Sequence, residues 1–253
     1  MLIEHISVSR KQCYEQCPIQ YKYRYHEKVQ SNEPIADHFV YGTLIHKIVE
    51  EYIKEQGKKE IYQIALDIFK NKILLEDNTP NPQLPEQYKK NLKLHLNNLK
   101  KLSDQIGYDG YLEWDFFYDL EPPNKKCIKG FIDRLIIRDE KYFILDYKTT
   151  KKGMWRKNQN TIRNDLQLRI YSRIVQKTFN AKPENIRAAL FYILDSDLIS
   201  TKFTEESLEM AEKELLDTYN EIKNIDVNDI FGKTGNHCRF CQYKKICPYY
   251  SLT

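Results

Sequence analysis

Long apolar runs are missing from this sequence of 253 residues, as are a secretion-type N-terminus, an internal repeat and a motor motif. No stretch is long and apolar enough to cross a bilayer, so the sequence predicts no membrane span. Residues 1–10 carry charge and no apolar run, which argues against a signal peptide and favours a cytoplasmic protein with reduced thiols. No G-x-x-x-x-G-K-[ST] stretch occurs, which excludes a P-loop helicase motor within the chain.

A strong excess of one charge is also lacking. The formal net charge is +4, the pI is near 8.5, and charged residues make up 30% of the chain. This mildly basic balance permits phosphate contacts without demanding a nucleic-acid partner. Residues 148–157 form a basic segment that contains Trp155. Stacking and phosphate contact are typical of single-strand binding, although a flexible basic loop explains the pattern equally well.

Residues 130–149 are the most informative segment, because they read as two apolar strands joined by a turn at Asp139 to Lys141. Asp146 and Lys148 are two residues apart and therefore share one face of the second strand. Tyr147, between them, is expected to point into the core.

The turn is expected to bring Asp133, on the first strand, beside Asp146 and Lys148. Both strands are apolar enough to be buried on both faces, where a carboxylate is costly unless a metal ion or an opposite charge compensates it. Two carboxylates and an ammonium suit a hard cation such as Mg²⁺ or Mn²⁺, with the lysine near an attacking water.

Three motifs in order make the chain similar to a known family. They are G-x-x-D at Asp133, apolar-D-Y-K-T at Asp146, and D-L-Q-L-R-I-Y with Gln167 and Tyr171. With His46 in an upstream helical G-T-L-I-H, the pattern resembles the PD-(D/E)xK nuclease superfamily in its RecB-like branch. The resemblance implies an α/β fold with an αββαβ core, in which helices flank a mixed sheet.

The resemblance also implies a ligand set for one or two Mg²⁺ or Mn²⁺ ions. His46, through a neutral imidazole nitrogen, Asp133, Asp146 and the backbone carbonyl of Tyr147 would hold the metal. Hydrolysis of a phosphodiester bond by a metal-activated water would follow, with Lys148 orienting the water and stabilising the developing charge.

Relatives often carry a further acidic residue on the strand before this hairpin. Glu113 is the preferred candidate, and Asp115, two residues later on the same strand face, competes for the role. Gln167 and Tyr171 are spaced i, i+4 and share a helix face. In the family this pair borders the active site; otherwise the tyrosine packs in the core and the glutamine is exposed.

A second constellation is C-x2-C-x5-C, formed by Cys238, Cys241 and Cys247 near the C-terminus. Three clustered thiols need a fourth ligand. In relatives with an iron–sulfur cluster, one cysteine comes from an N-terminal S-x-S…Y-x-x-C-P segment, and Cys17 occupies that place here. Four thiolates suit a [4Fe–4S] cluster or structural zinc.

The resemblance favours iron–sulfur, whereas a zinc site would also admit His5 or His237. Cys13 is the spare thiol one helical turn before Cys17, and Cys127, among strand residues, is expected to be a small buried side chain. In a reducing compartment, ligation is favoured over disulfide formation.

One nuclease domain is expected over residues 1–253, divided into an N-terminal helix with the cluster cysteine (1–35), a helical wall (36–105), the nuclease core (106–200) and a C-terminal helix with the cysteine group (201–253). The predicted helices are 9–25, 42–56, 60–76, 85–104, 162–177 and 205–225, and the predicted strands are 110–120, 127–138, 142–149 and 186–194.

The resemblance extends to the CRISPR-adaptation nucleases and the AddB nuclease domain, and it implies a DNA exonuclease acting on single-stranded ends. Such an enzyme would act alone or with a separate helicase or a recombination or CRISPR-type factor. Two alternatives stay open: a structure-specific endonuclease on the same core, and a non-catalytic iron–sulfur subunit that binds DNA ends.

Overall fold

The computed structural model describes residues 3–30, 37–72, 86–119, 127–150, 153 and 156–250. The chain forms two compact units. The first consists of Met1–Pro34, Asp115–Phe131 and Thr204–Thr253, and the second consists of Ile35–Trp114 and Ile132–Phe203. Each unit therefore gathers segments that are far apart in the sequence.

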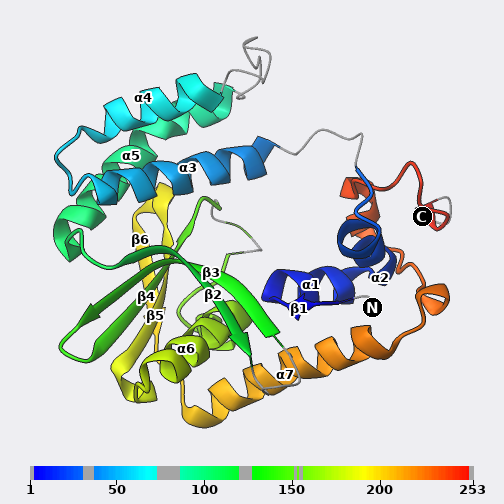
Figure 1. Ribbon diagram of the computed structural model, residues 1–253. Helices are drawn as coiled ribbons and strands as arrows, with labels where there is room; N and C mark the ends of the chain where they lie inside the picture. Colours follow the sequence, from blue (N-terminus) through cyan, green and yellow to red (C-terminus); the bar gives the residue numbers. More distant parts are fainter. Residues whose placement is uncertain are drawn as a thin grey trace. The chain divides into compact units, whose positions relative to one another are not determined.

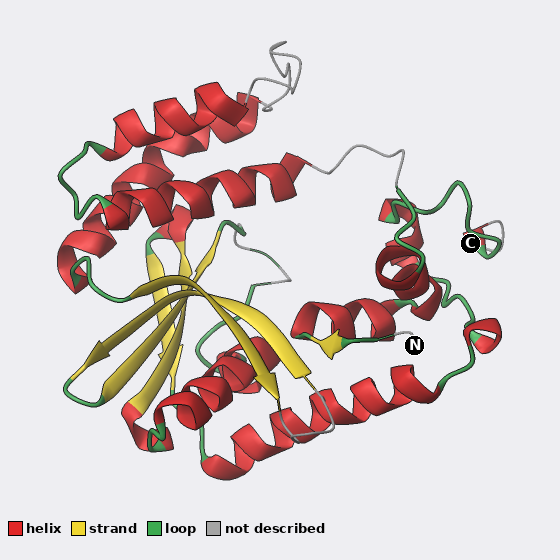
Figure 2. Cartoon of the chain, viewed as in Figure 1, coloured by secondary structure: helices red, strands yellow, loops and turns green. Residues whose placement is uncertain are grey.

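A mixed sheet forms the centre of the second unit (Figures 1 and 2). Strands β3 (Cys127–Arg138), β4 (Lys141–Lys148), β5 (Ile186–Tyr192) and β6 (Asp197–Thr201) are neighbours in that order, and β2 (Tyr111–Asp119) pairs with β3. β4 runs antiparallel to β3 and parallel to β5, and β5 runs antiparallel to β6. The predicted mixed sheet is confirmed. The short strand β6 was not predicted.

Helices cover both faces of this sheet. α3 (Asp37–Lys54), α4 (Ile61–Lys72) and α5 (Glu86–Ile106) lie together over one face, and α6 (Leu166–Phe179) lies against the other (Figure 1). Tyr147 of β4 is 2% exposed and belongs to the core formed with α3, α4 and α5. Its expected orientation is confirmed, and its neighbours on β4 consequently face α6.

Two arginines of β3 bind the C-terminal end of α5. The fully buried Arg134 donates through Nη2 to the carbonyl oxygens of Gly107 (2.6 Å) and Asp109 (3.0 Å). Arg138 donates to the carbonyl of Ile106 at 2.5 Å and pairs with the Asp109 carboxylate. Cations suit a helix C-terminus, where carbonyls lack intrahelical partners. These bonds hold α5 on the strand that carries Asp133.

The first unit joins the two ends of the chain. Tyr14 donates to Glu221 Oε1 at 2.9 Å, and Lys11 lies 3.3 Å from Glu214 Oε1. The N-terminal segment thus packs on the last long helix. The elements of this unit include β1 (His5–Ile6), which pairs with the start of β3, α1 (Val8–Gln16), α2 (Pro18–Tyr21), a π-helix (Lys22–His26), α7 (Glu205–Asn224) and a 3₁₀ segment (Asn236–Phe240).

The prediction of one continuous helix from Ser9 to Tyr25 is wrong. The helix breaks at Cys17, whose backbone is extended at φ −161° and ψ 107°. Pro18 causes the break, because a proline ring disfavours the helical conformation of the preceding residue. The break ends α1 immediately before the cluster-candidate cysteine.

The helix predicted from Ile162 begins four residues later, at Leu166. Asp165 caps it by accepting a hydrogen bond from the Leu168 amide, and Ile162–Asn164 forms a separate 3₁₀ turn. The capping carboxylate satisfies an N-terminal amide of the helix, and it therefore fixes the start of α6 at Leu166.

Candidate active site

The last residues of β4 bring a carboxylate and an ammonium group together. Asp146 and Lys148 project from the same face, and Lys148 Nζ lies 2.6 Å from Asp146 Oδ2. Asp146 is 2% exposed, and the Lys148 ammonium is the charged group that faces its Oδ2. The ammonium therefore balances the charge of a carboxylate that is almost completely removed from solvent.

Asp133 reaches the same place from β3. Its Oδ2 accepts a hydrogen bond of 2.7 Å from the backbone amide of Tyr147, which fixes the carboxylate between the two strands. The β3–β4 hairpin closes with a two-residue turn, because Arg138 pairs with Lys141. The predicted turn and the approach of Asp133 to β4 are thus both present.

His46 of α3 and Glu113 of β2 complete the acidic group. His46 Nδ1 lies 3.5 Å from Asp133 Oδ1 and 3.9 Å from Glu113 Oε1. One ligand atom from each of these three residues lies within 4.8 Å of the other two. Asp115 is exposed and does not belong to this group. The geometry thus brings Glu113, rather than Asp115, to the histidine.

Glu113 has an unusual backbone. Its φ is +44°, which lies in the left-handed region that side chains with a Cβ rarely adopt. Such a conformation typically costs about 1–3 kcal/mol and survives only where surrounding structure enforces it. The positive φ of Glu113 interrupts the alternation of side chains between the two faces of β2. The prediction that Glu113 and Asp115 share a strand face assumed a regular strand at this position.

Burial and charge shift the protonation of these groups. Burial raises the pKa of Asp146 to about 6, although the Lys148 ammonium opposes the shift. Burial acts to lower the pKa of His46, but the Asp133 carboxylate outweighs it and, with Glu113, raises that pKa to about 10. Burial acts to lower the pKa of Lys148, but the Asp146 carboxylate outweighs burial, so the pKa of Lys148 is raised.

Gln167 and Tyr171 of α6 border this group. Lys148 Nζ donates to Gln167 Oε1 at 3.3 Å, and Gln167 Nε2 donates to the Tyr171 hydroxyl at 2.7 Å. Burial raises the pKa of Tyr171 well above its usual value, and the nearby Asp146 acts in the same direction. The chain of contacts holds the lysine in place from the helix side.

A cleft of about 680 Å³ opens over these side chains. Two of its lining residues, Lys47 and Glu50, were not singled out from the sequence, although Glu50 is four residues after His46 and shares its helix face. Lys47 Nζ lies 2.9 Å from Glu50 Oε2. Trp155 of the predicted basic segment lies outside the described residues.

The side chains fit a hard divalent cation. The carboxylate oxygens of Glu113 and Asp133 converge with the His46 imidazole, and the buried Asp146 carboxylate, whose charge Lys148 balances, offers a further oxygen ligand. Without an ion, the excess acidic charge is balanced by the His46 imidazolium and Lys148. A bound cation would replace the proton on the histidine, since a ligand imidazole must be neutral.

In the first unit, the four cysteines that the sequence grouped line one cavity. Cys17, Cys238, Cys241 and Cys247 all line one cavity, together with His237. Within the described residues, no three of these sulfur atoms lie within 4.8 Å of one another. His237 Nε2 lies 3.7 Å from Cys238 Sγ. Sequence positions more than 200 residues apart are thus brought to one place.

The other two cysteines do not line this cavity. Cys13 is buried one helical turn before Cys17, and burial raises the pKa of its thiol to about 11. Cys127 is 4% exposed at the start of β3, as predicted. All six cysteines are free thiols, so no disulfide competes with ligation.

The comparison with protein families identifies the chain. A model of the PD-(D/E)XK nuclease superfamily matches residues 5–248, and the chain therefore belongs to this superfamily. No curated protein matches the sequence. No helix within the described ranges is long and apolar enough to span a bilayer.

One solved structure supports the fold. A crystal structure from Eubacterium rectale, described as a candidate exonuclease, aligns with a TM-score of 0.57 at 12% identity, covering 96% of this chain and 89% of its own. At this identity the likeness concerns the fold alone. The structure of SSO0001 aligns with a TM-score of 0.39 at 16% identity, covering 92% of this chain and 94% of its own.

Proposed function

We propose that this member of a nuclease superfamily is a Mg²⁺- or Mn²⁺-dependent deoxyribonuclease of the RecB-like branch, and that it acts as an exonuclease on single-stranded ends. The observation that carries the proposal is the group of His46, Glu113 and Asp133 ligand atoms within 4.8 Å, beside the Asp146–Lys148 pair. Carboxylates that can bind a divalent cation, next to an ammonium that can stabilise negative charge, are the groups that metal-assisted phosphodiester hydrolysis requires.

His46, Asp133, Asp146 and the Tyr147 carbonyl would hold the ion, and the position of Glu113 adds it to this ligand set. A bound divalent ion would polarise the phosphate and make a bound water more acidic. Lys148 would keep its proton, because Asp146 raises its pKa, and would stabilise negative charge on the phosphate as the bond breaks.

Gln167 would position Lys148, because the amide oxygen accepts from the ammonium while Tyr171 anchors the amide nitrogen. Lys47, at the rim of the cleft, would offer a second cation to the substrate backbone. Single-stranded DNA is proposed because the family resemblance of the three motifs extends to nucleases acting on ends.

The test uses two labelled substrates with Mn²⁺, one linear and one circular single-stranded DNA. An exonuclease degrades only the linear form. Cutting of both forms would favour a structure-specific endonuclease, and cutting of neither would favour a DNA-end-binding subunit. Asp146→Asn should abolish any cutting, and the exposed Asp217→Asn, outside the cleft, should leave it unchanged.

We further propose that Cys17, Cys238, Cys241 and Cys247 hold a [4Fe–4S] cluster. In support, all four line one cavity, and their sulfur atoms are too dispersed for a preformed zinc site, where Zn–S bonds of about 2.3 Å require sulfurs roughly 3.8 Å apart. A cluster spreads its ligands further, because each thiolate binds a different iron. Zinc stays the second candidate because His237 lies next to Cys238.

Metal content decides between the two. Protein purified without oxygen should be brown and contain about four irons and four sulfides per chain, as the cluster type requires. One zinc per chain and no iron would contradict the proposal. Cys17→Ser should lose the metal, and Cys127→Ala, at a buried cysteine outside the cavity, should keep it.

A further inference from the structure

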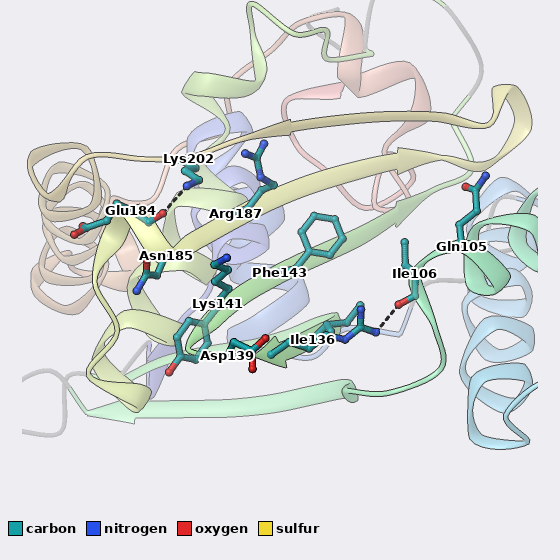
Figure 3. A pocket seen from close by; sticks show the side chains of 12 residues that line it. Gln105, Ile106, Ile136, Asp139, Lys141, Phe143, Glu184, Asn185, Arg187 and Lys202 are labelled. Atoms are coloured by element: carbon teal, nitrogen blue, oxygen red, sulfur yellow. Dashed lines mark hydrogen bonds between the residues drawn. The ribbon is translucent and has the colours of Figure 1, made fainter.

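A second cavity of the nuclease unit, about 600 Å³ in volume, lies at the opposite end of β4 from Asp146 and Lys148 (Figure 3). It opens where β4 and β5 begin, beside the C-terminal end of α5. None of its lining residues lines the catalytic cleft. A pocket of this volume has room for one small organic molecule.

The strand register builds an apolar floor with cations around it. Ile136 pairs with Phe143 and Phe143 pairs with Arg187, so these three side chains form one row on one face of the sheet. Ile106 of α5 adds to the apolar surface. Lys202 follows the last residue of β6 and, by extension of the β5–β6 register, stands beside Arg187.

This cavity is separate from the candidate active site. Phe143 and Asp146 are three residues apart on one strand, so their side chains leave opposite faces. Phe143 packs against the α3–α5 core, whereas Asp146 faces α6. A ligand on Phe143 would therefore not reach the acidic group.

Three of the four cations in the cavity have no acidic partner. Arg138 is occupied by Asp109, but no carboxylate in the described part of the chain pairs with Lys141, Arg187 or Lys202. Arg187 Nη1 donates to Ser200 Oγ at 3.1 Å, and Lys202 Nζ donates to the Glu184 carbonyl at 2.6 Å, so neutral groups orient both.

Two acids also line the cavity, Asp139 and Glu184. The Glu184 carboxylate points away from the Phe143 ring, and only its backbone oxygen meets Lys202 (Figure 3). The space over the ring is therefore bordered by three cations, Lys141, Arg187 and Lys202, and by one carboxylate, that of Asp139.

We propose that this cavity binds a nucleoside 5′-monophosphate, with the base on Phe143 and the phosphate held by Lys141, Arg187 and Lys202. An aromatic floor suits a flat base, and an arginine with two lysines suits a phosphate dianion. The amides of Gln105 and Asn185 line the same space and can meet the polar edge of a base. Inorganic phosphate alone would leave the apolar floor uncovered.

Isothermal titration calorimetry of ligand binding to the Asp146→Asn protein tests the proposal. The substitution removes nuclease activity, and EDTA in the buffer removes divalent ions. The probes are thymidine 5′-monophosphate, thymidine and inorganic phosphate. The monophosphate is expected to bind at least about tenfold more tightly than thymidine or phosphate, since each contributes only part of the contacts. Arg187→Gln should weaken its binding about tenfold or more, as expected when a charged hydrogen bond is lost.

Phe143→Leu tests the contribution of the base separately from that of the phosphate. It should weaken binding of the monophosphate and leave binding of inorganic phosphate unchanged. The exposed Arg163→Gln, which lies outside the cavity, serves as the matched control. No binding of the monophosphate at millimolar concentration would overturn the proposal. So would equal affinity for inorganic phosphate, or full binding of the monophosphate by a folded Arg187→Gln protein.

Discussion

The acidic site and the cysteine cavity are built in different ways. The acidic site depends on strand register: Asp146 and Lys148 share a face of β4, and a two-residue turn sets Asp133 beside them. The cysteine cavity depends on segments from both chain ends, with a helix break at Cys17 on one side and a short 3₁₀ segment and turns on the other.

The two sites also differ in charge and strain. The acidic site holds carboxylates close together, and it includes Glu113 with a left-handed backbone. No described non-glycine residue that lines the cysteine cavity has a positive φ. Within the described residues, backbone strain is therefore a feature of the acidic site and not of the cysteine cavity.

Replacing the ammonium tests the first half of this comparison and has the largest expected effect. Lys148→Met should lower the single-turnover rate by about 10²–10³-fold, the usual loss when one charge-stabilising group is removed. Mn²⁺ affinity should rise or stay the same, because Asp146 loses its competing cation. Calorimetry and rapid quench measure both. A parallel loss of Mn²⁺ affinity would show that the lysine is structural.

Removing one cluster ligand tests the second half. Cys17→Ser should lower the free energy of unfolding of the first unit by about 3 kcal/mol or more, because metal-ligand bonds contribute directly to folding. Cys13→Ser, at a buried neighbour outside the cavity, should cost about 1 kcal/mol. Denaturant titration followed at tyrosines of this unit measures both. Equal losses would remove the distinction between the two cysteines.

Much of the acidic site was predictable because a strand has a fixed period of two. Asp146 and Lys148 had to share a face, Tyr147 had to oppose them, and the short turn had to return the chain. The bounds of β3 agree with the prediction, and β4 begins one residue earlier. Glu113 was less certain, since nothing in its identity predicts a positive φ, which the surrounding fold imposes.

The cysteine cavity was predictable only through family resemblance. Spacing groups Cys238, Cys241 and Cys247, but no local rule connects Cys17 to them across more than 200 residues. The helix break at Cys17 had a local signal in Pro18 that the predicted continuous helix ignored. Strand β6 has only five residues, too few for periodicity to mark it without its partner β5.

The acidic site and the cysteine cavity should also differ in how metal binding depends on pH. This effect is expected to be smaller than those of the two substitutions above. The pKa of His46 is raised to about 10, so the ion must displace its proton, and Mn²⁺ affinity should rise about tenfold per pH unit between roughly pH 7 and 9. The rise should steepen below about pH 6, where Asp146 also binds a proton. Iron content of the cysteine site should not change over the same range.

The stability of the metal-free protein should change with pH in the opposite direction to its Mn²⁺ affinity. A histidine with a raised folded pKa stabilises the fold below its unfolded pKa, and this contribution is lost as the pH rises towards 10. Asp146, also raised, makes the metal-free protein less stable as the pH rises from its ordinary value through about 6. Thermal unfolding with EDTA should therefore show stability falling with pH, and His46→Asn should flatten both profiles.

The smallest effect concerns backbone strain, which distinguishes the acidic site from the cysteine cavity. Glu113→Gly and Glu113→Ala both remove the carboxylate, but only glycine adopts a φ of +44° without steric cost. The glycine variant should therefore be more stable than the alanine variant by about 1 kcal/mol, at the lower end of the left-handed penalty. At Asp115, which has no positive φ, the order should reverse, because glycine weakens an ordinary strand position. Chemical denaturation of the four variants measures both differences, and the same order at both positions would mean that Glu113 is not strained.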